Sequence, residues 1–174
     1  TEPNSDKDLE KDKKKFKIKK EFYKIDIDEV KNNIELCNYN SDKVHFIKGD
    51  VIKTLDDIIP EKISILRLDT DWYESTKKEL EVLYKKVSNN GFVIIDDYNN
   101  KDTHGNPRGA RVACNEFFPM ISNEMNIIKP LSNDDNIPFS FQKKILNKKI
   151  TCFSYSNNNK VYDITFPTIK AYCQ

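Results

Sequence analysis

The most constraining feature of this sequence is a strand, a helix and a second strand that follow one another between residues 63 and 95. Residues 63–68 (ISILRL) have the composition of a β-strand, and residues 92–95 (FVII) are an uninterrupted apolar run. Between them, four apolar residues recur at the spacing of one helical face: Leu80, Leu83, Tyr84 and Val87. Such a unit joins two parallel strands by a right-handed crossover, which predicts an α/β fold. The run at 92–95 also predicts a strand buried on both faces.

Acidic residues follow both predicted strands at their carboxyl ends. Asp69 ends the first strand, and Asp96 and Asp97 end the second. Parallel strands end at the same edge of a sheet, where open α/β folds bind ligands, so we expect the three carboxylates to lie close together. Carboxylates brought together repel one another, and a hard divalent cation removes that repulsion. Asp69, Asp96 and Asp97 are therefore predicted to hold Mg²⁺ or another divalent cation, provided that the chain turns at Asp96.

Two charged neighbours of these acids are expected to have structural roles. Asp71 is predicted to cap the helix that starts near Tyr73 and to stay outside the metal site. Arg67 lies within an apolar strand, and a charge in that position requires an acidic partner if it is buried. We therefore expect Arg67 to form an ion pair.

The chain is expected to divide into three parts. Residues 1–25 are rich in lysine and have few large apolar residues, which predicts a solvated tail or linker. Residues 26–147 are predicted to form the α/β domain, and residues 148–174 a C-terminal β extension with a turn at 157–159. The domain is expected to contain further elements besides the central unit: a helix over 27–38 capped by Asp26, a strand over 44–48, a helix over 108–118, and a late antiparallel hairpin of 127–128 and 139–145.

Composition excludes several classes of protein. The net charge is +1, from 29 basic and 28 acidic residues, so there is no global attraction to nucleic acid or to an anionic membrane. No apolar run approaches the roughly 20 residues that a membrane helix needs. The four cysteines contain no C-x-x-C pair, which speaks against a zinc site and favours reduced thiols in a cytoplasmic protein.

Three segments resemble the macrocin O-methyltransferase family: LRLDTDWYEST (66–76), GFVIIDDY (91–98) and GARVACNEFF (109–118). The resemblance covers about residues 26–120, with the segments in order and at matching distances. It implies a class I methyltransferase fold: a partial Rossmann-like parallel sheet with helices on both faces and a late antiparallel edge hairpin. It further implies methyl transfer from S-adenosylmethionine to a hydroxyl, with a sugar as the acceptor class, and Mg²⁺ on Asp69, Asp96 and Asp97.

The resemblance also assigns roles to individual residues. Asp69 is expected to accept the proton of the acceptor hydroxyl as well as to bind the cation. Gly49 and Asp50 stand where methyltransferases of this fold touch the adenine of S-adenosylmethionine, and a simple turn-forming Gly-Asp is an equally good interpretation. The glycine-rich turn that holds the methionine part of the cofactor in the family has no counterpart, so the resemblance is to the C-terminal portion of the domain.

Two alternative functions stay open at this point. Asp69-Thr70-Asp71 after an apolar strand also resembles the D-x-D motif of metal-dependent glycosyltransferases, although that motif leaves Asp96 and Asp97 unexplained. The other alternative is a degenerate methyltransferase-like domain without catalysis. The expected partners are a small-molecule or glycan acceptor, with no nucleic acid and no membrane. A second copy or another protein is expected to complete the sheet at its apolar edge.

Overall fold

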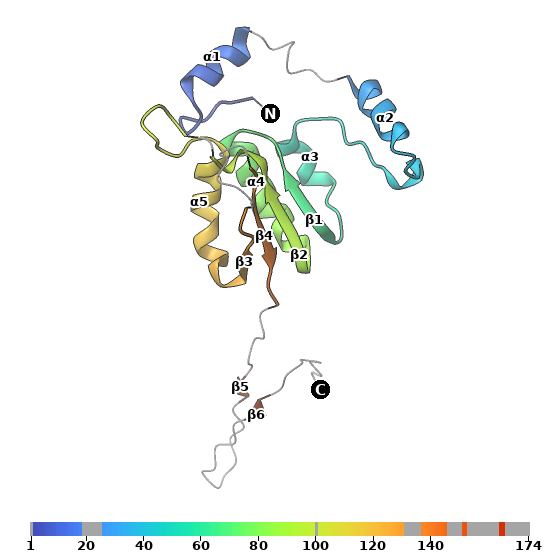
Figure 1. Cartoon of the computed structure of the whole chain (residues 1–174), viewed down its shortest axis with the longest axis vertical. Helices are drawn as coiled ribbons and strands as arrows, with labels where there is room; N and C mark the ends of the chain where they lie inside the picture. The colour runs from blue at the N-terminus through green and yellow to red at the C-terminus, as the bar shows by residue number, and fades with distance from the viewer. Residues whose placement is uncertain are drawn as a thin grey trace.

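A four-stranded sheet forms the centre of the computed structural model (Figure 1). The structure describes residues 2–18, 26–99, 101–130 and 137–145, together with the backbone of 151–152 and 164–165. The strands are β1 (Ile63–Leu68), β2 (Val87–Ile95), β3 (Met125–Ile127) and β4 (Phe139–Lys143), in the order β1-β2-β4-β3. The predicted α/β class is confirmed.

The pairing of the strands agrees with the prediction. β1 and β2 are parallel, with Leu66 opposite Val93 and Leu68 opposite Ile95. β4 runs antiparallel to both β2 and β3, so the late hairpin is present and β3 lies at an edge of the sheet. Because β1 and β2 run in the same direction, the residues that follow them are brought to one end of the sheet.

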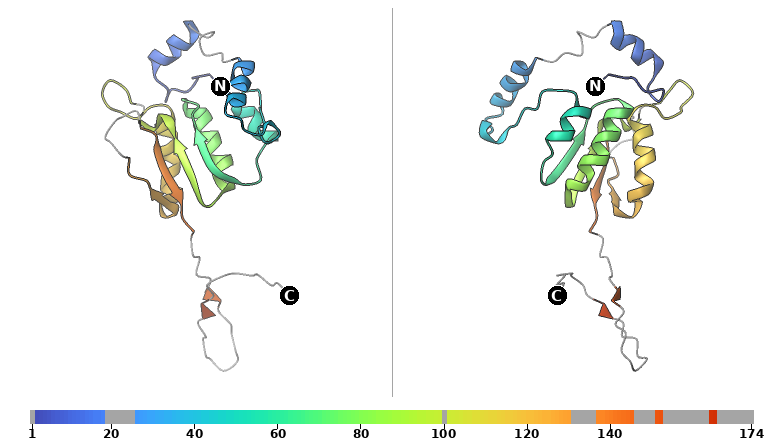
Figure 2. Two further views of the ribbon diagram at one scale, coloured as in Figure 1. Left: turned by 45° about the vertical axis from the view of Figure 1, so that its right-hand side comes forward. Right: turned by 180° about the vertical axis from the view of Figure 1, so that it is seen from behind.

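Three helices pack on one face of the sheet (Figure 2, right): α3 (Val51–Asp57), α4 (Tyr73–Leu83) and α5 (Ala110–Ile121). The predicted helix over 108–118 is thus present as α5. α4 contacts both α3 and α5. Leu80 of α4, Cys114 of α5 and Phe141 of β4 are completely buried in the core between the helices and the sheet.

The opposite face of the sheet differs from the expectation of helices on both faces. In the described part of the chain this face keeps apolar side chains in solvent: Ile65 is 63% exposed and its neighbour Phe92 on β2 is 39% exposed. Successive side chains of a strand point to opposite faces. Val93 and Ile95 therefore enter the core, whereas Phe92 of the same apolar run does not.

The lysine-rich N-terminal segment is partly structured, which corrects the expectation of a solvated tail. Residues 10–18 form helix α1 (Glu10–Ile18), and the segment before it lies against the domain. Asp8 is only 3% exposed, and its Oδ1 accepts a hydrogen bond from the Tyr73 amide at 2.9 Å. The Lys7 carbonyl accepts one from the Gly109 amide at 2.8 Å. These contacts join positions far apart in sequence, so no local sequence pattern could have predicted them.

Replacing Asp8 with alanine should destabilise the fold by about 1–2 kcal/mol, the usual cost of removing a side chain that caps a helix N-terminus. The Tyr73 amide at the start of α4 would lose its acceptor while buried. Urea unfolding measures this loss. The same change at Asp6, which is exposed, should alter the free energy of unfolding by less than about 0.5 kcal/mol; equal effects of the two changes would contradict the capping role.

In the first part of the domain, the structure agrees with the prediction at helix α2 and departs from it at residues 44–48. Helix α2 (Ile27–Leu36) begins as expected, with an Asp26 oxygen accepting a hydrogen bond from the Asp28 amide at 3.0 Å. The strand predicted over 44–48 is wrong. That segment forms no ladder with any described strand, and a strand requires a neighbour for its backbone hydrogen bonds.

The C-terminal extension is described only in two short pieces. β5 (Thr151–Cys152) and β6 (Ile164–Thr165) pair antiparallel, in keeping with the predicted strand pair. The turn expected at 157–159 lies outside the described residues. Among the described helices, none combines the length and the apolar character that crossing a membrane requires.

Candidate functional site

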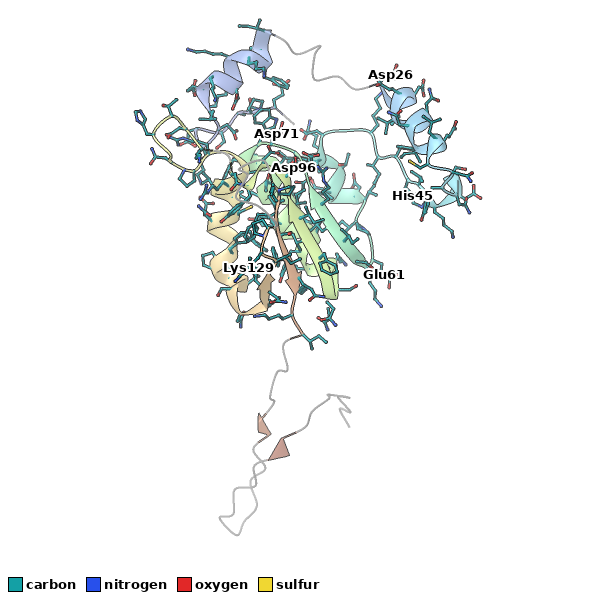
Figure 3. The ribbon with its side chains drawn as sticks, viewed as in Figure 1. Asp26, His45, Glu61, Asp71, Asp96 and Lys129 are labelled. Atoms are coloured by element: carbon teal, nitrogen blue, oxygen red, sulfur yellow. The ribbon has the colours of Figure 1, made fainter. Side chains whose placement is uncertain are left out.

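The three predicted metal-binding acids lie together at the carboxyl end of the sheet. Asp69 follows β1, and Asp96 and Asp97 follow β2, where the chain enters a 3₁₀ turn over Asp96–Asn99. One carboxylate oxygen from each residue lies within 4.8 Å of the others. Figure 3 labels Asp96 at this end of the sheet. Because the chain turns at Asp96, the adjacent residues Asp96 and Asp97 can both face one ion.

Arg67 links two of the three acids. Its Nη1 contacts Asp69 Oδ2, and its Nη2 lies 2.8 Å from Asp96 Oδ1. The predicted ion pair is therefore present, although the Arg67 side chain is 52% exposed. The hydrogen bond to Asp69 raises the pKa of Arg67. Burial and the negative charge of Asp69 raise the pKa of Asp96, and Arg67 opposes that rise. The arrangement shows an excess of negative charge that one guanidinium partly neutralises.

Asp71 does not have the capping role predicted for it. The N-cap residue of α4 is Trp72, without a side-chain cap, and the Tyr73 amide is bound by Asp8 instead. Asp71 itself has a left-handed backbone, with φ at 62°. A side chain at Gly109 would meet the Asp71 carbonyl at 2.8 Å, so glycine is needed where α5 begins. Asp71 thus contributes its left-handed backbone conformation to the turn between β1 and α4.

Two further residues support this turn and were missed by the sequence analysis. The Thr70 hydroxyl donates a hydrogen bond to Glu79 Oε2 at 2.8 Å. Glu79 is only 6% exposed, and burial raises its pKa to about 7. A signal was present in the sequence, because Glu79 stands three and four residues after Thr76 and Ser75, on the buried side of α4.

A second polar group borders the same end of the sheet, built from the N-terminal segment, α4 and α5. Lys7 Nζ lies 2.8 Å from the Tyr73 hydroxyl and 2.5 Å from Glu116 Oε1. The Tyr73 hydroxyl in turn donates to Glu116 Oε2 at 2.7 Å. These hydrogen bonds raise the pKa of Lys7 and lower that of Glu116. The group ties the N-terminal segment to both helices that flank the acids.

Gly49 and Asp50 form a helix start in the structure. Asp50 is the N-cap of α3, and its side chain accepts a hydrogen bond from the Ile52 amide at 3.2 Å. A side chain at Gly49 would come within 2.6 Å of Thr54. The local turn interpretation therefore describes their conformation. Contact with the adenine of a cofactor stays a prediction.

The donor set at the strand ends suits a hard divalent cation. All three groups are carboxylates, the ligands that Mg²⁺, Mn²⁺ and Ca²⁺ prefer. Asp69 is exposed and the other two are half-buried, so the cluster opens towards solvent, from which water or a substrate oxygen can complete a coordination shell. Asp71 is not a member of this cluster of described residues, which does not fit the D-x-D alternative.

Comparison with known proteins finds relatives that are named as O-methyltransferases. The chain is 39% identical over 74 residues to the 8-demethyl-8-(2,3-dimethoxy-alpha-L-rhamnosyl)-tetracenomycin-C 4'-O-methyltransferase of Streptomyces olivaceus, which is 42% of the chain and 28% of that enzyme. It is 39% identical over 71 residues to the demethyldecarbamoylnovobiocin O-methyltransferase of Streptomyces niveus, 41% of the chain and 27% of that enzyme. The matched segments thus span less than a third of these relatives.

The fold is also similar to that of a solved methyltransferase. The structure of the O-methyltransferase NovP matches with a TM-score of 0.60 and 24% identity, over 83% of this chain and 56% of the other. This likeness supports the predicted class I methyltransferase fold. The sequence match to the family described as Macrocin-O-methyltransferase (TylF) extends over residues 1–143. Because that match covers far more than half of the sequence, the chain belongs to the macrocin O-methyltransferase family.

Proposed function

We propose that this protein is a metal-dependent O-methyltransferase that transfers the methyl group of S-adenosylmethionine to a hydroxyl of a sugar. The observation that carries the proposal is the convergence of three carboxylates, within 4.8 Å of one another, at the end of the sheet. Membership of the family supports the reaction class. The rhamnosyl group in the name of one relative supports a sugar as the acceptor class.

Asp69, Asp96 and Asp97 are the residues that would hold the cation. A divalent cation there would supply Lewis acidity, which lowers the pKa of an acceptor hydroxyl. Asp69 is the most exposed of the three and can reach an acceptor arriving from solvent. In the proposed role it accepts the hydroxyl proton as the oxygen forms its bond to the methyl carbon and the bond from carbon to sulfur breaks, leaving a neutral thioether.

The rest of the site would position the two substrates. Gly49 and Asp50, at the start of α3, are proposed to contact the adenine of S-adenosylmethionine. Arg67 pairs with both Asp69 and Asp96 and so helps to fix the positions of their carboxylates. Orientation and fixed charges are the main contributions that a protein makes to such a displacement.

Titration of the chain with S-adenosylmethionine in a calorimeter, with and without Mg²⁺, tests the proposal. We expect binding, and with a panel of glycosides bearing free vicinal hydroxyls we expect methylated product that EDTA abolishes. Asp69→Asn should lower kcat by about a thousandfold, within the usual range for loss of a general base. The products are measured by mass spectrometry.

Two results would replace the proposal with one of the alternatives. Binding of Mg²⁺ with no binding of S-adenosylmethionine indicates a domain without catalysis. Binding of a nucleotide sugar in the presence of Mn²⁺ indicates a glycosyltransferase.

A further inference from the structure

Asp69 begins the turn between β1 and α4. The next residue of this turn, Thr70, is held by hydrogen bonds to residues at the start of α4 and within it. The Thr70 side chain donates its hydroxyl hydrogen to Glu79 Oε2 at 2.8 Å. The Thr70 carbonyl accepts hydrogen bonds from the Ser75 hydroxyl at 3.2 Å and from the Trp72 amide at 2.7 Å. Both polar groups of Thr70 beyond its amide are thus fixed by residues at or within the first two turns of α4.

The conformation of this turn requires such support. Asp71 has φ at 62°, a left-handed backbone that is uncommon for a residue with a side chain. Strained residues of this kind persist only where the surroundings determine them. The hydrogen bonds of Thr70, immediately before Asp71, supply that determination.

Glu79 is an unfavourable residue for packing alone. It is 6% exposed, on a face of α4 that otherwise buries Leu80, Ser75 and Thr76. Burying a carboxyl group costs free energy that an apolar residue would not cost. Among the described hydrogen bonds, its bond to Thr70 ties it directly to the turn that begins with Asp69. A costly side chain with such a contact is better explained by the site than by the stability of the core.

We propose that Glu79, acting through the Thr70 hydroxyl, is a positioning residue that fixes the turn after β1 so that the Asp69 carboxylate faces Asp96 and Asp97. The inference rests on the proposed function in one respect, since it takes these three acids as the cation site. Glu79 itself touches neither the cation nor the substrates in this role. Partners of metal ligands that act in this indirect way typically change metal affinity by about 10–100-fold when they are removed.

Hydrogen–deuterium exchange of the metal-free chain tests the positioning directly. Thr70→Val and Glu79→Ala should speed exchange of the Trp72 amide, which donates to the Thr70 carbonyl, by about tenfold. Thr70→Ser and Glu79→Gln keep a hydroxyl donor and an oxygen acceptor, so they should restore the wild-type rate. Thr54→Val on α3 is the matched control and should leave this amide unchanged.

Mn²⁺ titration followed by electron paramagnetic resonance tests the consequence. Thr70→Val and Glu79→Ala should bind Mn²⁺ about tenfold more weakly, and the Ser and Gln variants should stay within about threefold of wild type. The double variant Thr70→Val/Glu79→Ala should be no worse than either single change, because the two residues act through one hydrogen bond.

The two measurements separate this inference from the proposed function. Wild-type exchange at Trp72 in Thr70→Val overturns the positioning role, whatever the metal does. Wild-type Mn²⁺ affinity in Thr70→Val and Glu79→Ala overturns its link to the site. Failure of the wild-type chain to bind Mn²⁺ overturns the cation function and leaves exchange to decide the positioning role. Should Glu79→Ala not fold, the nearly isosteric Thr70→Val decides, since it leaves α4 unchanged.

Discussion

Replacing Asp96 with asparagine should weaken Mn²⁺ binding by at least about a hundredfold, because loss of a direct ligand exceeds the 10–100-fold loss seen for outer partners. Asparagine keeps the shape of the side chain and an oxygen that can accept from Arg67. The metal-free variant should therefore unfold within about 0.5 kcal/mol of wild type. Calorimetric titration with Mn²⁺ and urea unfolding of the same preparation measure the two quantities.

A matched control is available at Asp56. This acid lies on α3, pairs with Lys78, and has a side chain that is 64% exposed. The same change to asparagine there should leave Mn²⁺ affinity unchanged. Equal affinities of wild type and Asp96→Asn would show that the three carboxylates do not form a cation site.

Replacing Glu79 with glutamine should make the fold more stable at pH 8 by about 3 kcal/mol and much less so at pH 5. Burial raises the pKa of Glu79 from its ordinary value of 4.5 to about 7. Below pH 4.5 the carboxyl is neutral in both the folded and the unfolded chain, and Glu79 carries no charge penalty. Between pH 4.5 and 7 the unfolded chain releases its proton first, so the stability contributed by the neutral form is lost as pH rises. Glutamine stays neutral throughout and removes this dependence.

Urea unfolding of both proteins at pH 5 and pH 8, with EDTA present, measures the effect. The stability difference between variant and wild type should grow by about 2 kcal/mol between the two pH values. Glu81 lies on the same helix and is exposed, so Glu81→Gln should show less than about 0.5 kcal/mol at either pH. A difference at Glu79 that does not change with pH would mean that its carboxyl is ionised in the folded chain near its ordinary pKa.

The expected effects of the two Glu79 variants describe one compromise between the stability of the fold and the geometry of the site. Glu79→Gln is expected to stabilise the fold while keeping the hydrogen bond to Thr70. Glu79→Ala removes both the buried carboxyl and the bond that holds the turn after β1. Comparing the two variants therefore separates the cost of the charge from the benefit of the contact.

One face of the sheet leaves apolar side chains exposed to solvent. Ile65 and Phe92 lie on it in the described part of the chain. The matched portion of NovP is 56% of that protein, so the solved relative contains a large part with no counterpart in the comparison. The expectation that a second copy or another protein completes the sheet at its apolar edge stays a prediction.

The sequence by itself determined the parallel pair, the late hairpin and the cluster of Asp69, Asp96 and Asp97. Each depends on local regularity: an apolar run makes a strand, a helical stripe makes the crossover, and the residue after a strand lies at the end of the sheet. The family resemblance came from the same segments, because the residues that end the strands also carry its motifs.

Only the tertiary structure decided which groups support those acids. Asp8 caps α4 from 65 positions away, and Asp71, beside that helix, does not. Arg67 pairs with Asp96 across the end of the sheet. Glu79 accepts a hydrogen bond from Thr70, nine residues earlier in the chain. The strand expected over 44–48 failed for the same reason, since hydrogen-bond partners distant in sequence are set by packing and not by the local pattern.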